Sequence, residues 1–129
     1  MAIQDKIKVM VVDDMSTSRA LIYDCFDKLG VRNLSWAKNG TDALQAIKKQ
    51  PVHLVVSDYN MPGMNGLELL KALRSDAKTA KVGFILVTGS PDQSLIDKGR
   101  QLGMNNYLKK PFNHGDLMVC ISRVLGVFK

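Results

Sequence analysis

Residues 7–14 read Ile-Lys-Val-Met-Val-Val-Asp-Asp, an apolar run that ends in two adjacent carboxylates. Residues 52–58 repeat the pattern, because Val-His-Leu-Val-Val-Ser runs straight into Asp58. Runs this rich in β-branched residues predict buried parallel strands rather than half-exposed ones. In an open α/β sheet, ligands bind just beyond the carboxyl ends of the strands. If the two strands are neighbours, Asp13, Asp14 and Asp58 therefore meet in one crevice.

The rest of the chain alternates between strand-like and helix-like patterns, with no linker or internal repeat. Further strands are expected at residues 33–38, 82–88 and 105–109. Five helices are expected, one after each strand. The first covers 16–29 with Gly30 at C′, the second follows an Asn39 cap, and the third covers 65–74 with an Asn65/Glu68 capping box. The fourth runs from a Ser90 cap, with Pro91 at the first helical position, to near Gly103, and the fifth runs from Asn113 to Leu125. Strict alternation with helical crossovers predicts a single doubly wound (βα)5 domain, an α/β fold with a five-stranded parallel sheet and helices on both faces. These patterns alone leave the strand order open.

The bulk composition favours one compact domain over residues 1–129. With 46% hydrophobic residues the chain has enough apolar material for one core. It has no bilayer-length apolar stretch and no signal-peptide core, so we expect a cytoplasmic protein without a membrane partner. Cys25 and Cys120 lie inside helical patterns without metal-ligand spacing, which favours buried free thiols over a disulfide.

The net charge of +6 raises the question of nucleic acid. The 18 basic residues are scattered along the chain and are not interleaved with aromatic residues, which make up 6% of it. This distribution favours solvated faces with some attraction to acidic partners, and no nucleic-acid partner is expected.

The predicted crevice has a chemistry that a structural role does not explain. At about 4 Å and an effective dielectric near 20, each carboxylate pair costs on the order of 4 kcal/mol, so the cluster must be protonated, solvated or holding a cation. Oxygen ligands favour a hard divalent ion, and Mg2+ is the expected cofactor. The fourth strand ends in Thr88 and the fifth in Lys109 and Lys110, which adds a hydroxyl and an ammonium. Together these groups suit a phosphoryl group, and an aspartate nucleophile would form an aspartyl phosphate.

Asp13-Asp14, Asp58, Thr88, Tyr107 and Lys110-Pro111 resemble the motif set of the receiver domain of two-component response regulators. The segment from Ser57 to Leu70 is similar to the chemotaxis branch, the CheY-like proteins, in particular. The resemblance covers the whole chain and leaves nothing over for an output domain. It implies a flavodoxin-like sheet of order 2-1-3-4-5.

The resemblance also implies a role for each site residue. Asp58 would be the phosphoacceptor. Asp14, Asp58 and the backbone carbonyl of Asn60 would bind Mg2+ directly, and Asp13 would act mainly through a bound water. Lys110, held by a cis bond to Pro111, would pair with the acidic cluster and then with the phosphoryl oxygens.

Two further residues would carry the switch. Thr88 would donate its hydroxyl to the phosphoryl group, and Tyr107 would follow by turning from an exposed to a buried rotamer. Each has a simpler alternative: Thr88 as an ordinary strand residue and Tyr107 as core packing. Asp14 has one as well, as a helix N-cap, although a cap does not explain the second aspartate beside it. Lys109 competes with Lys110, which is favoured because it directly precedes the proline.

Two positions depart from the family's usual pattern. The family usually has Asp-Gly where this chain has Asn65-Gly66, and both pairs turn and cap. It usually has Ala after the threonine, where this chain has Gly89. The missing methyl group is expected to widen access to the phosphoryl group and shorten its lifetime.

The resemblance implies a stand-alone, monomeric switch protein rather than a turnover enzyme, although the protein would assist its own phosphorylation and dephosphorylation. The partners implied are a sensor histidine kinase, the flagellar motor switch protein and a phosphatase. The alternative is a phosphate sink or phosphorelay intermediate that drains the kinase without binding the motor. An aspartate-nucleophile phosphatase is disfavoured, because it would need a carboxylate at Asn60. A flavodoxin-like cofactor carrier is disfavoured because Asp13-Asp14 would repel phosphate unless a metal intervened.

Overall fold

The computed structural model describes residues 6–126, and in them five strands alternate with five helices. In chain order the elements are β1 (Lys8–Val12), α1 (Ser16–Lys28), β2 (Asn33–Ala37), α2 (Gly40–Lys49), β3 (Leu54–Asp58), α3 (Gly66–Arg74), β4 (Gly83–Thr88), α4 (Gln93–Gln101), β5 (Asn106–Lys109) and α5 (His114–Leu125). All strand pairs are parallel and the sheet order is β2-β1-β3-β4-β5. The predicted fold class and the order implied by the resemblance are both confirmed.

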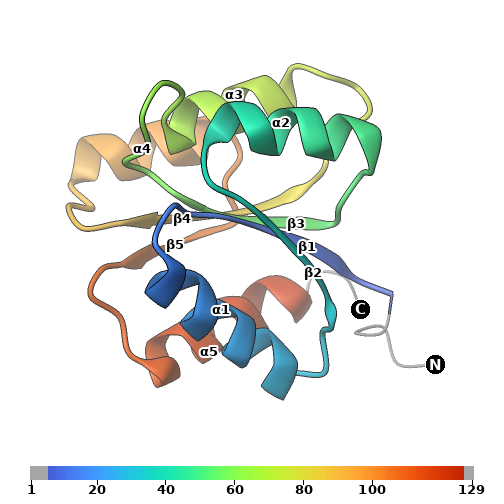
Figure 1. Cartoon of the computed structure of the whole chain (residues 1–129). Coiled ribbons are helices and arrows are strands. Elements are labelled where there is room, and N and C mark those ends of the chain that lie inside the picture. Colours follow the sequence, from blue (N-terminus) through green and yellow to red (C-terminus); the bar gives the residue numbers. More distant parts are fainter. Residues whose placement is uncertain (1–5, 127–129) are drawn as a thin grey trace.

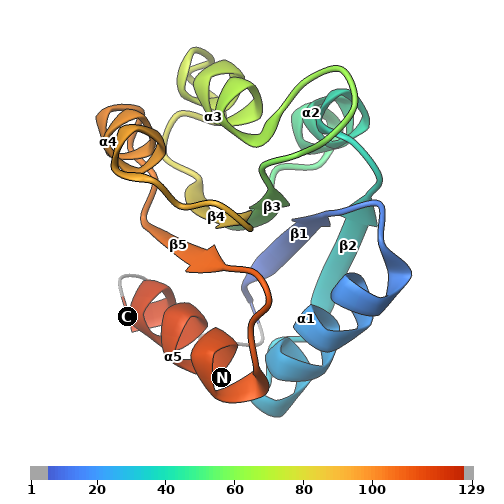
Figure 2. The same cartoon turned by 90° about the vertical axis from the view of Figure 1, so that its left-hand side faces the viewer.

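Helices cover both faces of the sheet. α1 and α5 lie on one face, and α2, α3 and α4 lie on the other (Figures 1 and 2). The alternation along β1 shows why: Val9 and Val11 belong to the core beneath α1 and α5, whereas Met10 and Val12 belong to the core beneath α2 and α3. Because apolar side chains leave both faces of the central strands, both faces must be covered.

The register brings the ends of the central strands level with one another. Val12 is paired with Ser57, Asp58 with Val87, and Thr88 with Lys109. The residues that follow β1, end β3 and β4, and follow β5 therefore share the carboxyl edge of the sheet. This edge is where an open α/β sheet binds ligands.

Most of the predicted helix starts and stops are confirmed. Asn39 caps α2, and Asn65 forms the expected capping box with Glu68 at the start of α3. Gly30 follows the end of α1 with a φ of 82°, as expected of a C′ glycine. Asn113 opens α5, again with a capping box.

The predicted start of α4 was wrong. Ser90 is not its N-cap and Pro91 is not its first residue; the cap is Asp92, whose carboxylate accepts from the Leu95 N–H at 2.8 Å. Ser90 is instead held in the preceding turn, because its N–H donates to Thr88 Oγ1 at 3.2 Å and its carbonyl accepts from the Asp92 N–H at 2.9 Å. The helix therefore begins two residues later than predicted, at Gln93.

Two predictions from composition can be compared with the structure. Cys25 and Cys120 are buried free thiols, as predicted, and burial raises the pKa of Cys120 to about 11, so this thiol stays protonated. Within the described part of the chain, no helix combines the length and the apolarity needed to cross a membrane.

Candidate functional site

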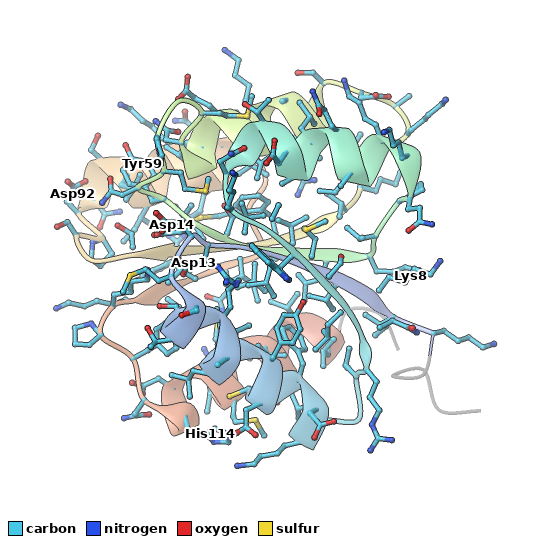
Figure 3. The ribbon with its side chains drawn as sticks, in the orientation of Figure 1. Lys8, Asp13, Asp14, Tyr59, Asp92 and His114 are labelled. Carbon is cyan, nitrogen blue, oxygen red and sulfur yellow. The ribbon has the colours of Figure 1, made fainter. Side chains whose placement is uncertain are left out.

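Three carboxylates meet at the carboxyl edge of the sheet. Asp13 and Asp14 follow β1, Asp58 ends β3, and one oxygen of each lies within 4.8 Å of the others. Asp13 and Asp58 are buried, at 2% and 8% exposure, and Asp14 is exposed. Figure 3 shows Asp13 and Asp14 where β1 gives way to α1, at the opposite end of β1 from Lys8. The cluster predicted from two strand ends is therefore present.

Lys110 supplies the positive charge of the site. Its Nζ lies 3.2 Å from Asp58 Oδ2 and 3.4 Å from Asp13 Oδ2. The residue follows the end of β5, and the Lys110–Pro111 peptide bond is cis, as the resemblance implied. Lys109, its competitor in the sequence, is exposed on β5. One lysine is thus shared by two buried carboxylates.

The Asp58 carboxyl is held in an environment that resists its ionisation. Burial raises the pKa of Asp58 above its ordinary value, and the neighbouring Asp13 raises it further. Lys110 opposes this through its charge and its hydrogen bond, and the backbone N–H of Asn60 also favours the charged form. The net direction of the pKa is upward. A cation or a covalent partner at this oxygen would relieve that unfavourable balance.

Asp13 is fixed by several contacts. Its Oδ1 accepts from the Met15 N–H at 2.9 Å, and its backbone N–H donates to the Ala37 carbonyl at 3.0 Å. Its backbone carbonyl accepts from Arg19 at 2.9 Å. The N-cap of α1 is Met15, which makes no side-chain cap bond, so the alternative in which Asp14 merely caps this helix is wrong. The exposed Asp14 carboxylate lies instead within the acidic cluster.

Thr88 and Tyr107 lie on the neighbouring strands β4 and β5. Thr88 is 2% exposed at the end of β4, and its Oγ1 accepts from the Ser90 N–H. Tyr107 is half-buried and packs against the core cluster beneath α3 and α4. That this ring turns from an exposed to a buried rotamer stays a prediction.

Gly66 keeps the Asp58 segment close to α3. A Cβ atom built on Gly66 would lie 2.7 Å from the Asp58 carbonyl oxygen and 2.7 Å from Leu86 Cδ1. The Gly66 N–H also donates to the Tyr59 carbonyl at 2.9 Å. A residue without a side chain is therefore required where the loop after β3 turns back into the helix.

Comparison with known proteins identifies the family. Residues 9–122 match the model of the response regulator receiver domain. The chain belongs to the response regulator receiver family. A probable chemotaxis protein CheY from Rhizobium etli is 41% identical over 129 residues, which is 100% of both chains. Chemotaxis protein CheY-3 from Vibrio cholerae is 34% identical and covers 92% of this chain and 91% of its own.

Solved structures agree with this assignment. The structure of chemotaxis protein CheY4 from Vibrio cholerae, crystallised at pH 4.0, superposes with a TM-score of 0.83 at 29% identity. The match covers 92% of this chain and 98% of that one. The receiver described here therefore has a CheY-like fold and belongs to a family of phosphoacceptor switches.

The acidic site of this receiver fits the Mg2+ that receiver domains bind. Asp13, Asp14 and Asp58 offer carboxylate oxygens within 4.8 Å of one another, which suits a hard cation of small radius. Asn60 is exposed directly after the strand that carries Asp58. That its carbonyl completes the ligand set stays a prediction.

Sequence patterns did not predict one contact of the acidic site, which Arg19 makes. Arg19 on α1 donates to the Asp13 carbonyl, and its guanidinium lies 3.8 Å from the ring centroid of Trp36 on β2. An arginine early in a helix and a tryptophan in a short strand carry no joint signal in the sequence. Only the placement of α1 against the edge of the sheet brings them together.

Proposed function

We propose that this receiver accepts a phosphoryl group on Asp58 from the phosphohistidine of a sensor histidine kinase, in a Mg2+-dependent reaction. The observation that carries the proposal is the environment of Asp58. Its carboxylate ends a buried strand, with Lys110 Nζ at 3.2 Å and two further carboxylates within 4.8 Å. A purely structural ion pair would not need three carboxylates for one lysine.

In the reaction, an Asp58 oxygen attacks phosphorus. An O–P bond forms, the P–N bond to the kinase imidazole breaks, and the electron pair returns to that nitrogen, which takes up a proton from solvent. Bound Mg2+ would neutralise charge on the transferred oxygens. Asp13, Asp14, Asp58 and the Asn60 carbonyl would hold the metal, with Asp13 acting through water. Lys110 would move from its carboxylate partners to a phosphoryl oxygen.

Phosphorylation would then reach the surface through Thr88 and Tyr107. The Thr88 hydroxyl accepts the Ser90 N–H and can donate its own proton to a phosphoryl oxygen at the same edge of the sheet. Movement of Thr88 would free space for the half-buried Tyr107 ring on the adjacent strand. The switch is a two-state change biased by one added phosphate.

The surface that Tyr107 would reshape is basic and hollowed. A cavity of about 600 Å³ lies between β5, α4 and α5. Its lining includes Tyr107, the exposed Val119, three basic residues and one carboxylate: Arg100, Lys109, Arg123 and Asp116. Such a surface favours an acidic partner segment with an apolar anchor.

We propose that this partner is the flagellar motor switch protein and that the receiver works alone. The names of the Rhizobium etli and Vibrio cholerae relatives support chemotaxis, and the Rhizobium etli relative is matched over its whole length. We further propose that the receiver acts as a cytoplasmic monomer and is reset by its own hydrolysis or by a phosphatase. A phosphate sink or relay intermediate is the alternative, and it would use the same Asp58 chemistry without the motor.

The phosphoacceptor is tested by incubating the chain with Mg2+ and acetyl phosphate and then measuring its mass. We expect a labile gain of one phosphate that is lost in Asp58→Asn and kept in Asp97→Asn, which removes an exposed carboxylate on α4. Phosphate release without any accumulated mass gain would instead indicate a phosphatase. A gain that persists in Asp58→Asn would contradict the assignment.

The output is tested by binding the motor switch protein with and without beryllofluoride as the phosphoryl mimic. Binding that rises with the mimic and is lost in Val119→Glu supports the motor role. Rapid phosphoryl drain from the kinase, without any such binding, supports the sink.

A further inference from the structure

The β2 edge of the sheet lacks the features that usually protect an edge strand. Among the described strands β2 pairs only with β1, so its outer side faces no other strand of the described chain, although the Leu34 N–H donates to the Arg32 carbonyl at 3.0 Å. Protected edges carry lysine, proline or a bulge, and β2 contains neither lysine nor proline. Its basic residues, Arg32 and Lys38, only flank the strand, whereas the opposite edge strand, β5, carries Lys109 within it and is followed by Lys110 and Pro111. The two edges of this sheet therefore differ in how readily they accept another strand.

A groove runs along β2 on the side of α2. It has a volume of about 380 Å³, and its lining includes Met10, Ser35, Ala46, Pro51 and Val52. Ser35 faces this side, because its Oγ lies 3.9 Å from the sulfur of Met10, which belongs to the core beneath α2. Small residues at Ser35 and Ala46 leave a space that a larger side chain would fill in a covered strand.

Trp36 follows Ser35 on the edge strand β2, and its side chain leaves the opposite face of the sheet, where Arg19 of α1 lies. It lines the groove, and 51% of its surface is exposed. Arg19 lies over its ring at 3.8 Å and is itself held by the Asp13 carbonyl. A ring that is already held loses little conformational entropy on binding.

The charges around the groove select its occupant. Lys8 and Arg32 line it, and among the described residues that line it there is no carboxylate. Arg32 also contacts Asp27 at 3.4 Å, but both side chains are mostly exposed, so that pair is weak and can be exchanged. A second copy of this chain would bring a net charge of +6 toward the same cations, which disfavours self-association.

From these four observations, we propose that the β2 edge is a docking surface for an extended, acidic segment of a partner protein. The segment would add a strand to β2, place one apolar side chain over Ser35 in the groove, present the next residue to Trp36 on the other face, and set its carboxylates against Lys8 and Arg32. Lys8 lies at the far end of β1 from Asp13 and Asp14 (Figure 3), so the Lys8 end of this surface is remote from the acidic site, whereas the Trp36 end reaches it through Arg19.

The emission of Trp36 tests the proposal directly, because it is the one tryptophan in the chain. The probe is a short peptide of alternating glutamate and valine, and the comparison peptide alternates lysine and valine. We expect a saturable change in emission with the acidic peptide, weakened by added salt, and none with the basic peptide. Backbone amide shifts in NMR spectra should centre on residues 33–37. Asp58→Asn should bind the peptide as the unmodified chain does, so failure of the phosphoacceptor assignment would not imitate failure here.

Two charge reversals supply the matched controls. Lys8→Glu should weaken peptide binding by about tenfold, since an attraction becomes a repulsion at the groove. Lys71→Glu changes the net charge by the same amount at an exposed position on α3, and it should leave peptide binding unchanged. Equal loss in both variants would reduce the effect to net charge and overturn the proposal. So would the absence of saturable binding, amide shifts centred elsewhere, or emission that changes with protein concentration alone, which would assign the groove to a second copy.

Discussion

Removing the charge of Asp58, the proposed phosphoacceptor, should make this receiver more stable when no divalent ion is present. The perturbation is Asp58→Asn, which keeps the shape of the side chain and deletes one of three clustered charges. With an effective dielectric near 20, the attraction lost to Lys110 at 3.2 Å is about 5 kcal/mol. The repulsion removed from Asp13 and Asp14, within 4.8 Å, is about 3.5 kcal/mol for each carboxylate.

The repulsion removed outweighs the attraction lost, so the folded variant should be the more stable. Solvent screens the exposed Asp14 and reduces its share, but burial of the Asp58 charge adds a desolvation cost that the amide does not pay. We therefore expect the free energy of unfolding to rise by about 1–2 kcal/mol at neutral pH. At about 4 °C per kcal/mol for a domain of this size, the melting temperature should rise by several degrees.

The effect should depend on pH with a definite sign. Since burial raises the pKa of Asp58 in the fold, its charge costs stability above the unfolded-state pKa and costs nothing where both states are protonated. The gap between variant and unmodified chain should be close to zero well below the ordinary value of 3.8 and should grow as the pH rises through the raised pKa.

Urea and thermal unfolding followed by circular dichroism, in chelator and then in Mg2+, measure these differences. Mg2+ should stabilise the unmodified chain more than Asp58→Asn and so narrow the gap. Asp97→Asn, on exposed α4, is the control and should change little under all conditions. The electrostatic reasoning would be refuted if Asp58→Asn were no more stable than the unmodified chain in chelator at neutral pH while the control stayed neutral.

Three further substitutions test individual contacts. Gly66→Ala should lower the free energy of unfolding by about 1–3 kcal/mol and reduce phosphorylation, because the added Cβ atom would lie 2.7 Å from the Asp58 carbonyl oxygen. A variant with unchanged phosphorylation and an unchanged midpoint of urea unfolding would contradict this. Gly89→Ala meets no atom within 4 Å and should raise stability by about 0.4–1 kcal/mol while lengthening the phosphoryl lifetime; an unaltered dephosphorylation rate would sink the access hypothesis. Asn113→Ala removes the cap whose Oδ1 accepts from the Asp116 N–H at 2.7 Å and should cost about 1 kcal/mol in urea unfolding, whereas Asn113→Ser should recover most of it.

Local sequence determined the elements and the composition of the acidic site. β-Branched runs, helical stripes and capping residues act over a few neighbouring positions, so they predicted the ten elements and placed Asp13, Asp14 and Asp58 at strand ends. The start of α4 was predicted wrongly because two candidate N-cap residues, Ser90 and Asp92, lie close together in the sequence. Their choice depends on a turn that the preceding strand end, Thr88, holds in place.

Tertiary structure decided what depends on residues far apart in the chain. The patterns left the strand order open, and only the family resemblance implied it; the order makes β1 and β3 neighbours and brings Lys110 to Asp13 across 97 positions. The same order leaves β2 at an edge, where Trp36 meets Arg19 and the basic groove opens. Periodicity reports which face of an element is buried, whereas sheet order and register decide which side chains meet. The acidic site could therefore be predicted from the sequence, whereas the β2 groove could be found only in the tertiary structure.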